Sequence, residues 1–162
     1  MARATLEVIT ALRVTARRLR IGAPYRWTHM GACNCGHLAQ TITRRSRVEI
    51  HSYAIQREGE WGDQVVHYCP TSGFPMDQIV GAMIDFGFNS GDLARLEKLD
   101  DPRILRRIPR ERRPLNFRDR DDVVLYMETW ASMLEEKLDS SSESQVAEHS
   151  SGAEAVPERL AS

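Results

Sequence analysis

Apolar residues recur at every third or fourth position through most of this sequence, and that spacing is typical of amphipathic α-helices. The first such stripe consists of Leu6, Ile9, Leu12, Ala16 and Leu19. It predicts a helix over residues 5–20, because Gly22 and Pro24 stop the pattern soon afterwards. The alternation of apolar and polar residues that marks a strand is almost absent, so the chain is constrained to an all-α fold.

Further helices follow from the same periodicity and from helix-start signals. Ser46 and Glu49 have the spacing of a capping box, in which each side chain caps the backbone N–H of the other residue. Pro75 suits the first turn of a helix, and Gly87 suits a helix end. The remaining predicted helices cover about 36–44, then 47–57, 76–86, 92–99, and from Asp119 or Asp121 to near Leu138. The expectation is therefore a small bundle of about five to six helices, with a loop region at 59–73 that contains Cys and His.

The end of the chain differs in composition from the rest. From Ser140 onward it is mostly Ser, Glu, Ala and Gly, which cannot bury enough apolar area to offset the entropy of ordering the chain. We therefore expect a helical domain at 3–138 followed by a disordered acidic tail at 139–162.

No stretch of the sequence is long and apolar enough to cross a bilayer, and Arg3, Glu7 and Arg13 interrupt the N-terminal segment. We therefore expect a cytoplasmic protein that does not act at a membrane. In a reducing compartment, the three cysteines are expected to bind a metal, to react or simply to be buried, rather than to form disulfides.

The strongest chemical signal is a cluster of Cys and His. Cys33, Cys35 and His37 lie close together in sequence, and Cys69 follows in a later loop region. Thiolate and imidazole are preferred zinc ligands, and four of them form a closed structural site. The sequence thus predicts a zinc site of Cys33, Cys35, His37 and Cys69, with His29 or His67 as a possible replacement ligand. The same set suits an iron–sulfur cluster. Because four protein ligands leave no position for substrate, we expect a regulatory or adaptor role rather than catalysis.

One alternative is thiol chemistry at Cys35, which would lie near a helix N-terminus that lowers the thiol pKa. His67 or His29 would act as its base. The segment Cys-Gly-His-Leu-Ala-Gln at 35–40 resembles, over six residues, the start of the nucleophile helix in papain-like cysteine peptidases. That resemblance implies a hydrolase or transferase whose histidine lies on a sheet.

Another alternative is nucleic-acid binding. Up to Arg120 the chain has 20 Lys and Arg against 13 Asp and Glu, a net charge of +7, and the remainder carries −8. The densest basic run consists of Arg103, Arg106, Arg107, Arg110, Arg112 and Arg113. These side chains can contact phosphates, and the helices at 76–86 and 92–99 have the outline of a helix-turn-helix. The same arginines can instead pair with nearby acids, including those of the last helix. The partner is therefore open between nucleic acid and another protein.

Overall fold

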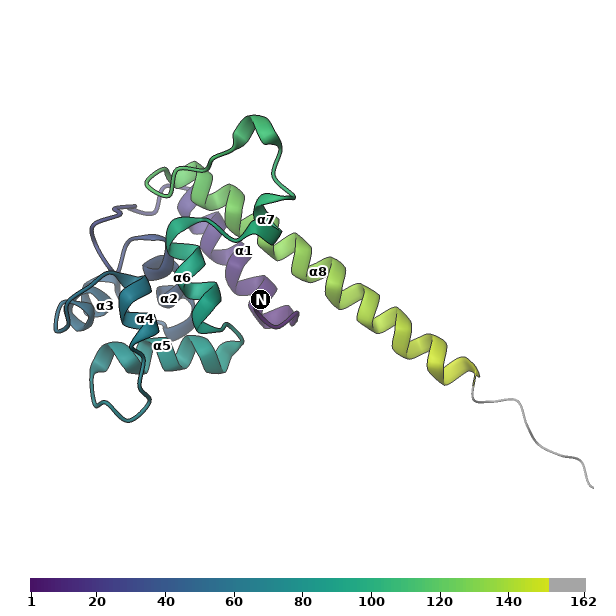
Figure 1. The fold of residues 1–162 in the computed structure, drawn as a ribbon, viewed down its shortest axis with the longest axis horizontal. Helices are drawn as coiled ribbons and strands as arrows, with labels where there is room; N and C mark the ends of the chain where they lie inside the picture. The colour runs from purple at the N-terminus through teal and green to yellow at the C-terminus, as the bar shows by residue number, and fades with distance from the viewer. Residues whose placement is uncertain (152–162) are drawn as a thin grey trace, which may run out of the picture.

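The computed structural model describes the backbone of residues 1–151 and the side chains of residues 1–142 (Figure 1). It confirms the all-α prediction, since residues 1–151 contain helices and no strand. The elements are α1 (Leu6–Arg20), α2 (Asn34–Thr43), α3 (Arg47–Ala54), α4 (Trp61–Val66), α5 (Pro75–Phe86), α6 (Ser90–Lys98), α7 (Pro102–Leu105), the 3-10 helix η1 (Arg110–Arg112) and α8 (Arg120–Ser151). Within the described backbone, no helix combines the length and the apolar character needed to cross a membrane.

The helix count exceeds the prediction because two short helices lie in segments that lack a periodic stripe. Helix α4 falls within the predicted loop at 59–73, and it is started by a reciprocal cap between Glu60 and Asp63. Helix α7 is started by Asp101, whose side chain accepts a hydrogen bond from the Arg103 N–H. A helix of four to six residues is too short to show periodicity, so only its caps could have revealed it.

Several helix boundaries also differ from the predicted ones. Helix α2 begins at Asn34 instead of near Gly36, and α3 ends at Ala54 instead of 57. Helix α8 continues to Ser151, beyond the predicted end near Leu138, and projects from the helical body (Figure 1). Of the predicted tail at 139–162, residues 152–162 lie outside the described residues.

Helices α1 and α8 form the most extensive helix pair in the molecule. They run antiparallel, since Arg13 pairs with Glu135 while Arg20, farther along α1, pairs with the earlier Glu128. Their apolar stripes face each other and supply large, fully buried side chains to the core. These include Leu12, Leu19, Tyr126, Trp130 and Leu134. Burial of this apolar area is the main force that holds the two ends of the described chain together.

Helix α2 lies in the centre of the body. It packs against α1, α3, α5 and α6, and residues 31–39 are buried without a break. Polar side chains in the buried first turns of α2 need partners inside the protein. Asn34 does so by donating from Nδ2 to the carbonyls of Leu96 and Glu97, at 3.1 and 3.0 Å.

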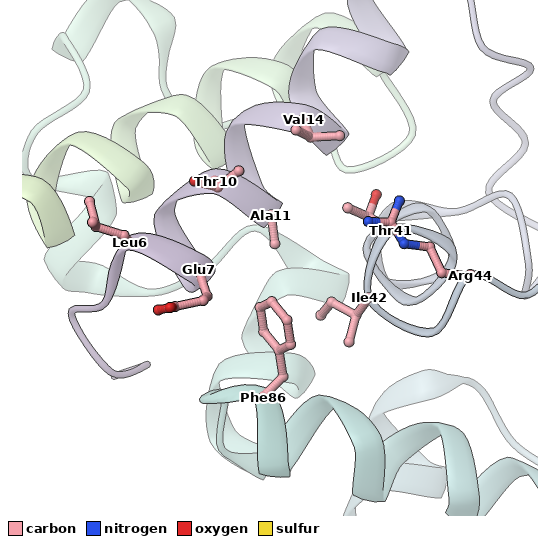
Figure 2. A pocket seen from close by; sticks show the side chains of 9 residues that line it. All are labelled: Leu6, Glu7, Thr10, Ala11, Val14, Thr41, Ile42, Arg44 and Phe86. Atoms are coloured by element: carbon pink, nitrogen blue, oxygen red, sulfur yellow. The ribbon is translucent and has the colours of Figure 1, made fainter.

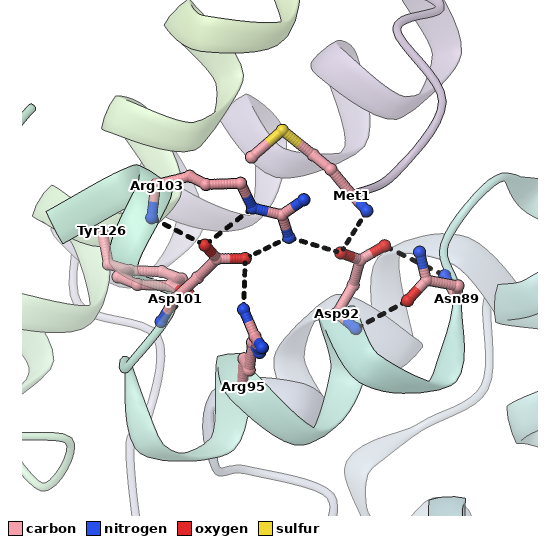
Figure 3. Close-up of polar contacts among 7 residues, drawn as sticks. All are labelled: Met1, Asn89, Asp92, Arg95, Asp101, Arg103 and Tyr126. Carbon is pink, nitrogen blue, oxygen red and sulfur yellow. Dashed lines mark hydrogen bonds and ion pairs between the residues drawn. The ribbon is translucent and has the colours of Figure 1, made fainter. Parts of the chain in front are cut away.

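A carboxylate network joins the chain start, α6 and α7 (Figure 3). Asp101 is 2% exposed and forms a two-pronged ion pair with Arg103, with Nε 2.9 Å from Oδ1 and Nη2 2.5 Å from Oδ2. The Tyr126 hydroxyl accepts a hydrogen bond from the Asp101 N–H, and the Met1 amino group lies 3.3 Å from Asp92. Burial opposes ionisation of Asp101, but the hydrogen bonds and charge of Arg103 outweigh it and lower the pKa.

We expect Asp101→Asn to lower the free energy of unfolding by about 1–3 kcal/mol near pH 6, because it removes charge-assisted hydrogen bonds while keeping a capping side chain. A carboxyl with a depressed folded-state pKa stabilises the fold above its unfolded-state pKa of about 3.9, and that contribution is lost as pH falls through the folded value. Urea titrations over a pH series should therefore show the wild-type advantage shrinking below about pH 4. An advantage that stays constant down to pH 2 would contradict this role for the charge.

Candidate functional site

The predicted metal ligands do not converge. Cys33 is the N-cap of α2, Cys35 and His37 lie in its first turns, and Cys69 lies in the loop before α5. The first three are buried, whereas Cys69 is exposed. Successive helix positions are rotated by about 100°, so residues two apart, such as Cys35 and His37, point in nearly opposite directions.

Each of these side chains has a separate partner. The Cys33 thiol lies 3.5 Å from the Met30 carbonyl, and the Cys35 thiol lies 3.4 Å from the Leu93 carbonyl. His37 donates from Nε2 to the Pro24 carbonyl at 2.9 Å. Among residues with described side chains, no group of three His, Cys, Asp or Glu residues is placed to hold a metal ion. Zinc and an iron–sulfur cluster therefore stay predictions of the sequence, for which this geometry supplies no donor set.

Burial opposes ionisation of both buried thiols. Burial raises the pKa of Cys33 to about 12 and raises that of Cys35 well above its usual value. Cys35 has no exposed surface, and residues 1–151 contain no strand that could carry a partner histidine. The environment of Cys35 thus opposes the nucleophilic role, because the thiolate is the reactive form.

Three of the six arginines in the dense run at 103–113 form ion pairs. Arg103 pairs with Asp101, Arg107 with Glu136 of α8, and Arg112 with Asp122 of α8. Half of the run therefore pairs with nearby acids, two of which belong to the last helix. Within the described part of the chain, Arg106 and Arg110 are exposed without such a partner.

In the predicted helix-turn-helix of α5 and α6, the second helix has no unpaired basic side chain that could contact base edges. Helix α6 packs against α4, and its two basic residues are engaged. Arg95 lies 3.6 Å from Asp101, and Lys98 lies 2.9 Å from Glu60. Helix α6 is therefore a core helix with internally paired charges.

A different pair of helices has the short connection of a helix-turn-helix. Helices α2 and α3 are joined by three residues, Arg44 to Ser46, and Arg44 adopts the left-handed conformation with φ 61° that turns the chain sharply. Ser46 and Glu49 form the predicted capping box at the start of α3. Helix α5 packs against both α2 and α3, which completes a three-helix unit. The sequence showed the two helices and the cap, but not that α3 would remain uncovered.

Basic side chains surround this turn, and we call them the α3 basic surface: Arg18, Arg26, Arg44, Arg45 and Arg47. Arg18 bonds to Gln40 and Thr41 at the end of α2, which brings α1 to the turn. Burial and the neighbouring His51 lower the pKa of His29, and the positive charges of Arg47 and Arg26 lower it further. On α3 itself the acidic side chain is Glu49, which is engaged by the cap and by Arg45. The surface therefore carries excess positive charge.

The inner side of α3 is fixed by the loop that precedes α2. A Cβ on Gly31 would lie 1.9 Å from the Arg47 carbonyl oxygen, so only glycine permits this close approach. His51 accepts a hydrogen bond from the Met30 N–H at Nδ1, and the His29 ring stacks on it at 4.0 Å between centroids. Ile50 and Ala54 are the buried residues of α3.

The outer side of α3 is free. Val48 is 64% exposed, and Ser52 is exposed beside it. Ile55 and Gln56, directly after the helix, are exposed as well. The guanidinium groups of Arg44 and Arg47 have no hydrogen bond or ion pair with any residue whose side chain is described. A mixed face of apolar, hydroxyl, amide and guanidinium groups is thus presented by a rigidly held helix.

Next to the turn, an apolar groove of about 400 Å³ lies between α1, α2 and α5 (Figure 2). Phe86 points from the end of α5 toward Ala11 of α1 and Ile42 of α2, and Arg44 lies at the groove's edge. The groove has apolar walls and few polar groups that could orient a small ligand.

Comparison with known proteins assigns no family: no family model matches the chain, and neither a curated protein nor a solved structure matches it. Function must therefore be inferred from the described geometry.

The environments of the three cysteines make a direct prediction about thiol reactivity. Hydrogen bonds from the Thr71 side chain and backbone lower the pKa of exposed Cys69, whereas Cys33 and Cys35 are buried. We expect iodoacetamide at neutral pH to label only Cys69 in the folded protein and all three cysteines after unfolding, as read by peptide mass spectrometry. Cys69→Ser should abolish labelling of the folded protein. Rapid labelling of Cys35 in the fold would restore the thiol-enzyme hypothesis.

Proposed function

We propose that this protein binds double-stranded DNA, with α2 and α3 as a helix-turn-helix and α3 as the helix that enters the major groove. The observation that carries this proposal is an uncovered helix, placed by a three-residue turn and flanked by unpaired arginines. In such motifs the first helix crosses the backbone and the second presents its N-terminal residues to the base edges.

Side chains on and beside α3 suit the two kinds of contact in such an interface, to phosphates and to bases. Arg44 in the turn and Arg26 in the preceding loop are exposed and positive, which suits contact with phosphates. Arg47 lies at the first position of α3, where a guanidinium can donate two hydrogen bonds to guanine. Val48 and Ser52 on the outer face match thymine methyl groups and base-edge donors or acceptors.

The distribution of charge over the molecule supports an orientation in which α3 faces the DNA. Helix α3 lies at the edge of the body opposite the projecting end of α8 (Figure 1). The last described turns of α8 before residue 143 carry Glu135, Glu136 and Asp139, all exposed. Glu135 and Glu136 offset the charges of their partners Arg13 and Arg107, so this end of the described molecule attracts phosphates less than the α3 basic surface does.

The proposal predicts a specific loss of binding when two arginines of the surface are removed. We expect the double variant Arg44→Ala/Arg47→Ala to bind a labelled duplex of about 20 base pairs at least about tenfold more weakly at ~50 mM salt. The log–log salt slope should become shallower by roughly two, one unit for each lost phosphate contact or fewer if Arg47 contacts a base. Fluorescence anisotropy over a salt series measures both quantities.

The matched control is Arg106→Ala/Arg110→Ala, which removes two other exposed arginines from the dense run at 103–113. We expect this variant to bind within about twofold of the wild type. The proposal fails if the wild type does not bind duplex DNA at low salt, if both pairs weaken binding equally, or if single-stranded nucleic acid binds more tightly. Thermal unfolding by circular dichroism verifies that both variants are folded.

A further inference from the structure

Two histidine rings stack on each other beside the start of α3: His29 from the loop before α2, and His51 from α3 itself. Their centroids lie 4.0 Å apart, and their planes differ by 23°. Nδ1 of His51 accepts a hydrogen bond from the Met30 N–H at 3.1 Å, and Nδ1 of His29 accepts from the Gly31 N–H at 3.2 Å. Two consecutive backbone N–H groups therefore hold both rings.

These hydrogen bonds determine where the ring protons lie. A neutral imidazole carries one proton, so a ring that accepts at Nδ1 carries its proton on Nε2 and donates from there. Burial, the neighbouring ring and nearby cations lower the pKa of His29, which favours this neutral form. Because both Nδ1 atoms face the backbone of residues 30 and 31, both Nε2–H groups point away from that backbone.

Both Nε2–H groups are free to donate to a ligand. For the side chains at positions 1–142, neither Nε2 atom has a hydrogen-bond partner, and neither is buried, so both atoms reach solvent. The Nε2 atom of His37, by contrast, is bonded to the Pro24 carbonyl at 2.9 Å. His29 and His51 are therefore the pair with donors available for an external acceptor.

The charged groups beside this pair attract anions. The positive charges of Arg47 and Arg26 act on His29, and both arginines are exposed. Arg47 and His51 are four residues apart on α3, so they lie on the same side of that helix. Glu49 points to a different side of α3 and is engaged by its own cap and by an ion pair. Two N–H donors and two guanidinium groups suit an anion with several acceptor oxygens.

We propose that the Nε2–H groups of His29 and His51 donate hydrogen bonds to one phosphate of the DNA backbone, beside Arg26 and Arg47. This assignment rests on the proposed DNA-binding function and adds two residues that position the DNA. In DNA complexes, phosphate contacts fix the register and orientation of the protein, whereas base contacts specify the sequence. One ring belongs to α3 and the other to the loop that holds it, so a phosphate bound here would orient α3 in the major groove.

The double variant His29→Asn/His51→Asn of the full-length chain tests this contact. The Asn Oδ1 atom has nearly the position of the His Nδ1 atom, so it keeps an acceptor for the backbone N–H groups while the Nε2 donor is lost. We expect the variant to bind a duplex of about 20 base pairs at least about fivefold more weakly at ~50 mM salt. The log–log salt slope should stay within about 0.5 of the wild-type value, because a neutral donor displaces no counterion. Fluorescence anisotropy measures both quantities.

The matched control is His67→Asn, which changes an exposed histidine directly after α4. We expect it to bind within about twofold of the wild type. Circular dichroism verifies that both variants are folded. A double variant that binds as tightly as the wild type would overturn the histidine contact and leave the proposed function intact, whereas a wild type that does not bind duplex DNA would overturn both.

NMR of the wild-type protein with ¹⁵N-labelled histidine tests the contact without any substitution. We expect duplex DNA to shift the Nε2 resonances of His29 and His51 and to slow exchange of their Hε2 protons with water, while those of His67 stay unchanged. Unchanged Nε2 resonances in the DNA-saturated protein would overturn the inference. Shifts with inorganic phosphate at the same ionic strength, but not with DNA, would assign the pair to free phosphate and overturn the DNA contact.

Discussion

The hydrogen bonds of Asn34 are the interaction on which the rest of this structure depends. The side chain has no exposed surface, and its Nδ2 reaches two carbonyls at the end of α6. Its Oδ1 lies 2.5 Å from the Tyr25 hydroxyl, which also lies 2.6 Å from the carbonyl of Phe117. Three segments distant in sequence are thereby fixed to the first residue of the central helix. Since an unsatisfied buried amide would cost several kcal/mol on the scale of roughly 2–7, the direction in which α2 enters the core is strongly determined.

That entry direction determines which groups the Cys side chains at the start of α2 contact. With Asn34 directed at α6, Cys33 and Cys35 are carried to the carbonyls of Met30 and Leu93. Sequence spacing shows that such residues are close along the chain, but not that a helix begins among them and turns their side chains apart. A tight loop through Gly36 would have allowed a common ion. Instead Gly36 packs directly against the backbone of residues 30 and 31, where a Cβ would lie 2.3 Å from the Met30 oxygen.

The predictable parts of the fold were those that depend on residues close together in the sequence. The stripe of α1 and the Ser46 capping box are readable because each depends on residues within a few positions of one another. The charged surface could not be read in the same way. Half of the arginines in the dense run at 103–113 pair with acids such as Glu136, which tertiary packing brings from far along the chain. The Arg44 and Arg47 side chains have no ion pair with any described side chain, and the neighbouring Glu49 is occupied by its own cap and by Arg45.

The loop before α2 holds two helices through a single residue. The Met30 N–H donates to His51 and so holds α3, while the Met30 carbonyl accepts from Trp61 and so holds the start of α4. Gly31 then lies directly against the start of α3, leaving no room for the loop to shift without moving the helix. Because one residue makes both contacts, the positions of α3 and of the start of α4 are set by the same short stretch of backbone. Glycine and histidine therefore have a structural role in this stretch: glycine permits the close approach, and the rings of His51 and His29 accept the backbone N–H groups of Met30 and Gly31.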